Sequence, residues 1–448
     1  MRLILRVLPA VLVPVLLLGQ QPLEPRLTPS VARDAMPSPP AGSAPRVGLY
    51  DSVAVVLKRD WPDSGVRRGI VEPVLQEHAA AAAAAQTFGD EVAVVKAMLA
   101  VIPASHLGLS SATAYRTLDR ALRGEREEMF GMQLLRWQGR WYATMVLNDG
   151  PAHRAGIRAW DEVVRVNGFV PDSSPVLDYS TDDAFLPDSI DPPVHPLRVD
   201  LVNECRFTVR VSRDSIADVT VVAERYSALE ATQSSVEVIE ADGLRVGYVH
   251  LWYMHFRLHD WLNRLLSGPL AGIDALVLDL RGRGGDGGLA TSMVETLTPG
   301  SHQRYRGTVV LLQDRQTRSA KEMLADGLRA RGVARIVGEA SAGAVLPSGE
   351  RRVGHGMMLM LPQKPSWGTY QRLELRRLEP DVRVSWAGPL GGATDPIFEA
   401  GLAEARRIVA SEGRGVVVPP PPPLVPRQEA AGVRQDVERK TLQLPSKP

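Results

Sequence analysis

The chain has 448 residues, enough for two to four domains, and its charges nearly cancel, with 52 Lys and Arg against 51 Asp and Glu. Nucleic-acid-binding domains usually carry a strongly basic face, so this balance argues against a nucleic-acid partner. Hydrophobic residues make up 44% of the chain, enough for ordinary globular cores. The single cysteine, Cys205, excludes an intramolecular disulfide framework and a cysteine-rich metal site.

The first 22 residues, MRLILRVLPAVLVPVLLLGQQP, predict a signal peptide or a membrane anchor. Two arginines precede an apolar stretch of about a dozen residues, which is the pattern of export signals and is short of the ~20 residues that a spanning helix needs. We therefore expect export to the periplasm, the cell envelope or the outside, with any membrane attachment through this segment alone. Residues 23–46 are rich in Pro, Ser and Ala and predict a linker.

Residues 47–126 have a helical pattern and residues 127–224 a β-rich one. The helix EVAVVKAMLAVI should end before Pro103, which places Ser105 and His106 in the loop that follows. Alternating stretches such as RWYATMVL, DEVVRVNG and RFTVRVS predict strands in the second segment.

From residue 225 to residue 412, apolar strands alternate with helices, which predicts a largely parallel, buried α/β layer. Expected strands are LRVGYVHL, IDALVLDL, GTVVLLQD and ARIVGEA, and expected helices are LATSMVETL and AKEMLADGLRAR. Residues 413–448 carry PPPPPLVP and a charged end, and predict a disordered tail that serves as a spacer or as a partner ligand.

Two patterns suggest ligands, and each has a simpler alternative. DLRGRGGDGG contains Gly282-x-Gly284-x-x-Gly287, which is formally a dinucleotide-binding fingerprint, but this segment lies deep in the chain. The alternative interpretation is a loop whose backbone N–H groups face an anion. His255 and His259 are four residues apart, as zinc ligands can be, but without the Glu of HExxH they are better explained as scattered surface or interface histidines. We expect neither a metal nor an organic cofactor.

Ser319, in RQTRSAKEML, lies between an expected strand and an expected helix. Serine is a common helix cap, so a structural role is the first hypothesis. A nucleophile would need a base, a group that orients the base, and donors for an oxyanion.

Taken together, the motifs of residues 47–408 resemble those of the tricorn and C-terminal processing protease family of serine peptidases. LVLDLRGRGG resembles its DLRGNxGG loop, QTRSAKE its nucleophile turn, IVGEASAG its GExTxG segment, and LELRRLEPDV its closing EGxGVxPD. Residues 130–168 are similar to a PDZ domain. The resemblance implies a ClpP/crotonase-like α/β core, an inserted PDZ-like β domain at residues 127–224 and a helical N-terminal segment.

The family has two catalytic forms, and the resemblance implies the tricorn-like one. The Ser–Lys form places its lysine where this chain has Ala344. The tricorn-like form uses a Ser-His pair, a nucleophile and a late glutamate, which implies catalytic roles for the four matching residues Ser105, His106, Ser319 and Glu374.

The resemblance also implies two binding sites. The N–H groups of Gly285 and Ala320 would form an oxyanion hole, and Gly131 and Met132 in FGMQLL would form a peptide-binding loop. Glu374 would contact either Ser105 or a bound peptide.

These matches predict an exported serine endopeptidase that acts on protein or peptide substrates with help from the PDZ-like domain. The alternative is a weak or inactive peptide-binding scaffold of the same fold; hydrolysis of a non-peptide ester or amide is a further one. Arg283, Arg318 and Arg377 stand where the family has an Asn, a small residue and a Gly. These arginines would narrow the cleft, favour acidic groups, or mark a degenerate enzyme.

Overall fold

The computed structural model describes most of the chain from residue 44 onward. The described ranges are 44–177, 194–212, 215–255, 257–300, 305–364, 372–384, 395–412 and 425–426. The predicted signal segment and nearly all of the Pro-rich tail lie outside these ranges. Within them, no helix combines the length and the apolar character needed to cross a membrane. The chain divides into two units, Met1–Met36 and Pro37–Pro448, and every element below belongs to the second.

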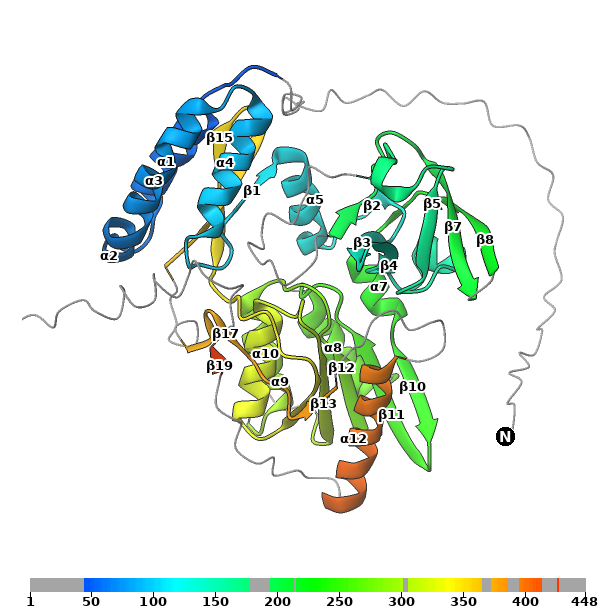
Figure 1. Cartoon of the computed structure of the whole chain (residues 1–448). Helices are drawn as coiled ribbons and strands as arrows, with labels where there is room; N and C mark the ends of the chain where they lie inside the picture. The colour runs from blue at the N-terminus through cyan, green and yellow to red at the C-terminus, as the bar shows by residue number, and fades with distance from the viewer. Residues whose placement is uncertain are drawn as a thin grey trace, which may run out of the picture. The chain divides into compact units, whose positions relative to one another are not determined.

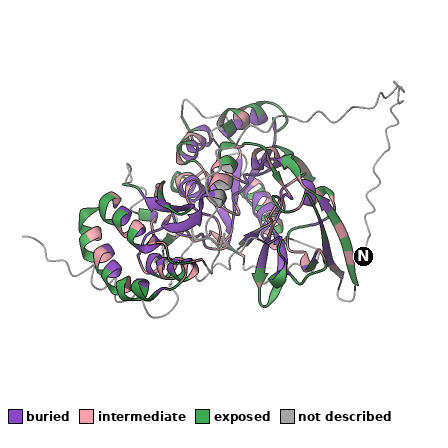
Figure 2. Cartoon of the chain, turned by 90° about the horizontal axis from the view of Figure 1, so that it is seen from above, coloured by how far each residue is buried: buried purple, intermediate pink, exposed green. Residues whose placement is uncertain are grey.

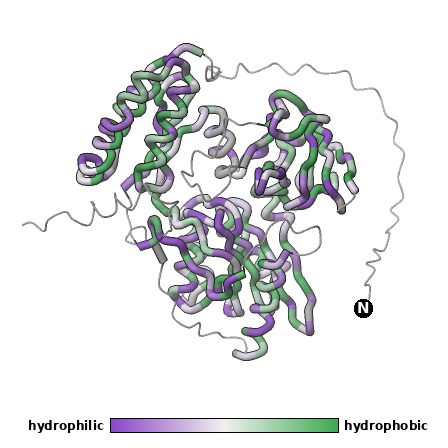
Figure 3. Tube along the Cα trace, in the orientation of Figure 1, coloured by the Kyte–Doolittle hydropathy of each residue, from purple (hydrophilic) through white to green (hydrophobic). Residues whose placement is uncertain are grey.

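The first helices share an apolar core with a hairpin from late in the chain. They are α1 (Leu49–Asp60), α2 (Ser64–Val66), the π-helix η1 (Arg67–Val71), α3 (Glu72–Ala84) and α4 (Phe88–Ala100). Their apolar faces pack with Leu109 and Leu359, which are paired across β1 (Gly108–Ser111) and β16 (Met357–Pro362). The hairpin partner of β16 is β15 (Ser348–Gly354), which lies next to α1 in Figure 1. Figure 3 shows that these helices contain both hydrophobic and hydrophilic residues.

A reciprocal cap fixes the start of α4. The backbone N–H of Asp90 donates to the Thr87 hydroxyl (3.1 Å), and the Thr87 N–H donates to the Asp90 carboxylate (2.8 Å). The helix ends at Ala100, three residues before Pro103. Ser105 and His106 therefore lie in the connection between α4 and β1, as predicted.

The β-rich segment forms a six-stranded antiparallel sheet in the order β6-β3-β4-β5-β7-β8, with β2 and β9 paired separately. Its core includes Phe130, Leu134, Val163 and Phe207. The elements are α5 (Ala112–Arg123), β2 (Glu127–Met129), β3 (Gln133–Trp137), β4 (Arg140–Thr144), α6 (Pro151–Arg154), β5 (Glu162–Val166), the 3-10 helix η2 (Pro171–Ser173), β6 (Val194–Pro196), β7 (Glu204–Ser212), β8 (Ser215–Val222) and β9 (Glu224–Tyr226).

The largest core surrounds a second six-stranded sheet, in the order β10-β11-β12-β13-β14-β18. All neighbours from β11 to β18 are parallel, and only the edge pair β10–β11 is antiparallel. The elements are α7 (Ala228–Ser234), β10 (Glu237–Ala241), β11 (Leu244–His250), α8 (Arg257–Ser267), β12 (Ala275–Asp279), α9 (Gly287–Leu297), β13 (Thr308–Gln313), α10 (Ala320–Ala330), β14 (Ala334–Gly338), β17 (Arg376–Arg377), β18 (Val382–Arg383), α12 (Pro396–Glu412) and β19 (Val425–Pro426), the last paired with β17.

Alternate residues of the central strands enter two different apolar clusters. Leu276 and Leu278 of β12 pack with side chains from α8, α9 and α10, whereas Ala275 and Val277 pack with α12. Because helices cover both faces, these strands need apolar residues at every position. Figure 2 shows the buried residues, in purple, concentrated in such interior elements.

The predicted mixed α/β architecture is confirmed, with parallel central strands and the expected helices between them. One irregularity lies in the β-rich segment. Trp160 has a left-handed backbone (φ 73°), which a glycine would adopt more easily.

Candidate active site

Three parallel strands end at one edge of the sheet and lead into three loops. β12 ends at Asp279, β13 at Gln313 and β14 at Gly338. The carboxyl ends of parallel strands meet at a common edge, where α/β proteins usually place their ligands. The loops touch there: the Gly282 N–H donates to Asp314 (3.1 Å), and the Ser319 N–H donates to the Ala344 carbonyl (2.8 Å).

Ser319 occupies a strained turn directly before α10. Its φ of 56° and ψ of −125° lie outside the regions that a serine prefers, and such backbone costs of order 1–3 kcal/mol. The Ser319 N–H has two acceptors, which hold the turn in place. They are the Ala344 carbonyl and Glu322 Oε2 (3.1 Å). The side chain is partly exposed, at the N-terminal, electropositive end of the helix.

The glycine loop lies against Ser319 so closely that larger residues cannot fit. A Cβ on Gly284 would sit 2.7 Å from the Ser319 Cβ, and one on Gly285 would sit 2.3 Å from the Met254 carbonyl oxygen. Gly285 also has a φ of 147°. Gly284 therefore brings bare backbone next to the Ser319 side chain, and Ala320 begins α10 directly after Ser319.

Ser105, His106 and Glu374 form one hydrogen-bonded chain. The Ser105 hydroxyl donates to Glu374 Oε2 (2.8 Å) and lies 3.0 Å from His106 Nδ1, and the Ser105 N–H donates to Glu374 Oε1 (2.7 Å). A hydroxyl has a single proton, so it accepts from Nδ1–H when it donates to the carboxylate. That arrangement leaves Nε2 of His106 as a proton acceptor.

The segment after Ala344 joins this chain to the Ser319 turn. The N–H groups of Val345 (3.0 Å) and Leu346 (3.2 Å) donate to Glu374 Oε2, and the neighbouring Ala344 carbonyl accepts the Ser319 N–H. Among the hydrogen bonds of the described residues, none joins His106 to the Ser319 hydroxyl. Catalytic hydrogen bonds often tighten only when substrate binds.

Burial moves the pKa values of the histidine and the glutamate in opposite directions. Burial, together with the Arg318 guanidinium, lowers the pKa of His106 to about 3. Burial raises the pKa of Glu374, against the four hydrogen bonds that its carboxylate accepts. In this structure His106 is therefore the neutral imidazole at ordinary pH.

Glu322 is a residue of this site that the sequence analysis missed. Its buried carboxylate accepts the N–H groups of Ser319, Gly343 (2.7 Å) and Ala344 (2.8 Å) and the hydroxyl of Ser341, and burial raises its pKa to about 7. The spacing Ser-x-x-Glu from Ser319 is a capping-box pattern and would have indicated it.

Lys321 lies two residues after Ser319 on α10. Its fully buried Nζ donates to the carbonyls of Trp252 (3.2 Å) and Arg281 (2.9 Å), which ties α10 to the start of the glycine loop. Burial lowers its pKa to about 7.

The predicted peptide-binding residues lie on the β-rich segment instead. Gly131 has a φ of 73° and its carbonyl accepts the Leu147 N–H (2.8 Å), while Met132 is buried directly before β3. One edge of β3 pairs with β4, and the other pairs with β6, for example Leu134 with His195. The chain itself thus occupies the edge to which a peptide strand would be added.

The other candidate ligand patterns have structural partners. His250 stacks on Trp252 with ring centroids 3.8 Å apart, and the N–H of Arg257 donates to His255 Nδ1 (3.1 Å). Within the described ranges, no group of three His, Cys, Asp or Glu residues has the arrangement of a metal site. Gly287 does begin α9 after a strand, as a dinucleotide loop would, but the Asp286 carboxylate caps that helix (2.8 Å to the Leu289 N–H).

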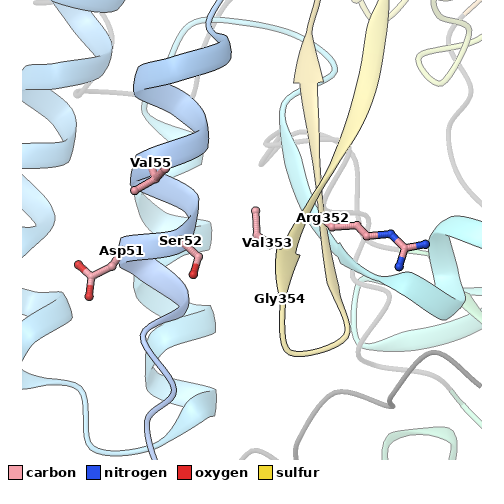
Figure 4. Close-up of a pocket in the computed structure, with 6 residues that line it drawn as sticks. All are labelled: Asp51, Ser52, Val55, Arg352, Val353 and Gly354. Carbon is pink, nitrogen blue, oxygen red and sulfur yellow. The ribbon is translucent and has the colours of Figure 1, made fainter.

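A hollow between α1 and the β15–β16 hairpin is separate from these residues (Figure 4). It is lined by Asp51, Ser52, Val55, Arg352, Val353 and Gly354. None of the candidate catalytic residues lines it.

Residues 296–384 match the model of peptidase family S41, a segment that contains Ser319, Glu322 and Glu374. Over this segment, about a fifth of its length, the chain is similar to peptidase family S41. A search of curated proteins by sequence gives no match.

The chain is also similar to several solved structures. The photosystem II D1 C-terminal processing protease is 16% identical, over 82% of this chain and 98% of that one, with a TM-score of 0.47. The tricorn protease is 16% identical, over 80% of this chain and 36% of that one, with a TM-score of 0.48. A putative S41 protease from Bacteroides fragilis is 15% identical, over 67% and 86%, with a TM-score of 0.43.

Replacing Glu374 by glutamine should lower the kcat for peptide cleavage about 10- to 100-fold. The amide has one oxygen where the carboxylate has two, so buried N–H groups lose acceptors, at about 1–3 kcal/mol, and each 1.36 kcal/mol is tenfold in rate. Steady-state kinetics on an unfolded protein substrate would measure the change, with thermal unfolding recorded alongside. Glu399→Gln, on the exposed first turn of α12, is the matched control. Equal kcat values for the two variants would contradict a role for Glu374.

The fall of peptidase activity at acid pH should reflect the protonation of a carboxylate and not that of His106. His106 has a pKa of about 3, whereas the pKa of Glu374 is raised from 4.5 and that of Glu322 reaches about 7. Since each carboxylate accepts hydrogen bonds in its charged form, activity should fall as pH decreases through the raised pKa. The measurement is kcat/KM against pH for the wild type and for Glu374→Gln and Glu322→Gln. If the acid limb of the pH profile lies at the same pH in both variants, the titrating group is neither Glu374 nor Glu322.

Proposed function

We propose that the chain is a serine endopeptidase of the tricorn-like type, with Ser319 as its nucleophile. The hydrogen-bonded chain from His106 through Ser105 to Glu374 is the observation that carries this proposal. It leaves a neutral imidazole nitrogen as the acceptor that a nucleophilic serine needs. The strained turn at Ser319, which exposes a hydroxyl at a helix N-terminus beside a glycine loop, supports it.

In the proposed mechanism, Nε2 of His106 accepts the proton of the Ser319 hydroxyl as its oxygen attacks the scissile carbonyl. The imidazolium then returns that proton to the leaving amine, and a water molecule releases the acyl group by the same route. The Ser105 hydroxyl accepts from Nδ1–H throughout and passes the stabilisation of Glu374 to the imidazolium. The N–H groups of Gly285 and Ala320 donate to the oxyanion.

We also propose export, on the basis of the N-terminal signal pattern, and substrates that are proteins or peptides. The β-rich segment would assist by binding a substrate segment at Gly131 and Met132 through strand addition. Since β6 already pairs with β3, this assistance requires the three-residue β6 to leave that edge. A peptide that binds there would therefore compete with residues 194–196 of the chain itself.

Covalent labelling tests the proposed function directly. The full chain is treated with a fluorophosphonate probe, digested and analysed by mass spectrometry, and its cleavage of an unfolded protein is followed before and after treatment. We expect the probe to modify Ser319 and to stop cleavage. A folded chain that neither cleaves the substrate nor reacts with the probe would favour the inactive scaffold. Modification of another serine would assign the role of nucleophile to that serine.

A further inference from the structure

Lys321, in the first turn of α10, joins two loops of the candidate site through one buried cation. Its side chain is fully buried, and Nζ donates to the carbonyls of Trp252 (3.2 Å) and Arg281 (2.9 Å). Trp252 lies after β11 and Arg281 lies after β12, so the two bonds tie both loops to α10. A buried cation stabilises a fold less well than apolar packing does. Its contribution is therefore better sought in the geometry of these loops.

The first of these carbonyls begins the glycine loop. The peptide bond between Arg281 and Gly282 is trans, so its C=O and its N–H point in opposite directions. The C=O accepts from Lys321, and the N–H of Gly282 donates to Asp314 Oδ1 (3.1 Å). This peptide plane is thus held on both sides, and the start of the loop cannot rotate without losing one of the two bonds.

The second carbonyl belongs to the segment that orients Gly285. Met254, two residues after Trp252, donates its N–H to the Gly284 carbonyl (3.1 Å) and accepts the Asp286 N–H (2.9 Å). The Gly284 carbonyl therefore points at Met254. The N–H of Gly285, on the same trans peptide, points away from Met254. The direction of this proposed oxyanion donor thus depends on a segment that the buried ammonium group holds in place.

The other proposed oxyanion donor, the N–H of Ala320, directly precedes Lys321 in the chain. It shares a trans peptide with the Ser319 carbonyl, which accepts the Met323 N–H (3.1 Å) inside α10. The Ala320 N–H therefore points out of the N-terminal end of the helix. Lys321 connects the two donors, because its backbone continues from Ala320 and its side chain reaches the loops that orient Gly285.

We propose that Lys321 is a positioning residue that sets the spacing between the Gly285 and Ala320 N–H groups of the oxyanion hole. This role rests on the proposed peptidase function and deepens it. Loss of one oxyanion donor costs on the order of 10²- to 10³-fold in kcat, so a displaced donor should cost about 10- to 100-fold. The donors act on the charged tetrahedral state, so kcat should fall while KM hardly changes.

Two variants of the full chain test the role. Lys321→Met keeps the length of the side chain and removes its N–H donors, whereas Lys321→Gln keeps two N–H donors without the charge. We expect Lys321→Met to lower kcat about 10- to 100-fold, and Lys321→Gln to recover part of that loss. Lys58→Met, on an exposed position of α1, is the matched control. Ile408→Val, in the core beneath α12, shows what a loss of stability alone does to kcat.

A ketone inhibitor supplies a readout that a merely structural role would not change. In a peptide trifluoromethyl ketone with the sequence of a cleaved substrate, the Ser319 oxygen adds to the carbonyl carbon. The C=O π bond becomes an oxyanion, and the hydroxyl proton passes to Nε2 of His106. The corresponding peptide alcohol cannot form this adduct and reports ground-state binding. In Lys321→Met, the inhibition constant of the ketone should rise by the factor by which kcat falls, and that of the alcohol should not change.

The outcomes separate this role from the proposed function. A wild-type kcat in folded Lys321→Met would overturn the role, and so would an equal loss of kcat in Ile408→Val. A fall in kcat with unchanged ketone affinity would show that Lys321 does not act on the oxyanion hole. If Lys321→Met does not fold, the same comparison of ketone and alcohol in Lys321→Gln decides. A folded wild type that neither cleaves peptides nor labels at Ser319 would overturn the peptidase function itself.

Discussion

Ser319→Ala should abolish peptide cleavage, with a fall in kcat on the order of 10⁴-fold or more, because the reaction loses the atom that forms the acyl intermediate. The loss should also remove fluorophosphonate labelling. Binding should persist, since the glycine loop and the start of α10 remain. The measurement is single-turnover cleavage of a fluorescent peptide at high enzyme concentration.

The alanine must keep a backbone φ of 56°, so the variant needs a check of its stability. Thermal unfolding of Ser319→Ala beside the wild type supplies it. Ser173→Ala, in the exposed turn η2, is the matched control and should cleave like the wild type. Cleavage by a folded Ser319→Ala at more than a hundredth of the wild-type rate would exclude Ser319 as the nucleophile.

His106→Ala should have the second-largest effect, a fall in kcat on the order of 10⁴-fold, since a serine hydroxyl without a base is a weak nucleophile. The residual rate should increase with pH because hydroxide replaces the missing base. Ser319 remains in this variant, so labelling should become slow but should not vanish. Comparing the labelling rates of His106→Ala and Ser319→Ala separates the base from the nucleophile.

The control for this variant is His355→Asn. His355 is an exposed histidine that also has positive φ (52°), which asparagine tolerates better than alanine does. It should keep the wild-type rate. A His106→Ala variant that labels and cleaves normally would transfer the role of base to another group, and Lys321 would be examined next because its pKa is lowered to about 7.

The sequence alone predicted the central sheet well because its pattern is local. The runs around Val277 and Val310 are apolar at every position, and helices bury both faces of such strands. The end of α4 and the loop position of His106 were predictable for the same reason, since Pro103 cannot continue a helix.

The long-range contacts of the site were not predictable from spacing. Ser105 and Glu374 are 269 residues apart, and only the resemblance to a family suggested that they act together. The pairing of Leu109 with Leu359 and of Leu134 with His195 likewise depends on the tertiary fold. The role of Glu322 was not predicted, although its Ser-x-x-Glu spacing from Ser319 is local and matches a capping box.

The hydrogen bond between Ser105 and Glu374 also has a consequence for synthesis on the ribosome. Ser105 and His106, the latter being the proposed base, emerge early, while Glu374 emerges 269 residues after Ser105. At about 5–20 residues per second, translation of that interval takes roughly 15 to 50 s. In the proposed mechanism, the nascent chain lacks during this time the group that fixes its imidazole, so it should not cut neighbouring nascent chains or itself. If the proposed roles hold, the order of the residues along the chain delays proteolytic activity until the core is nearly complete.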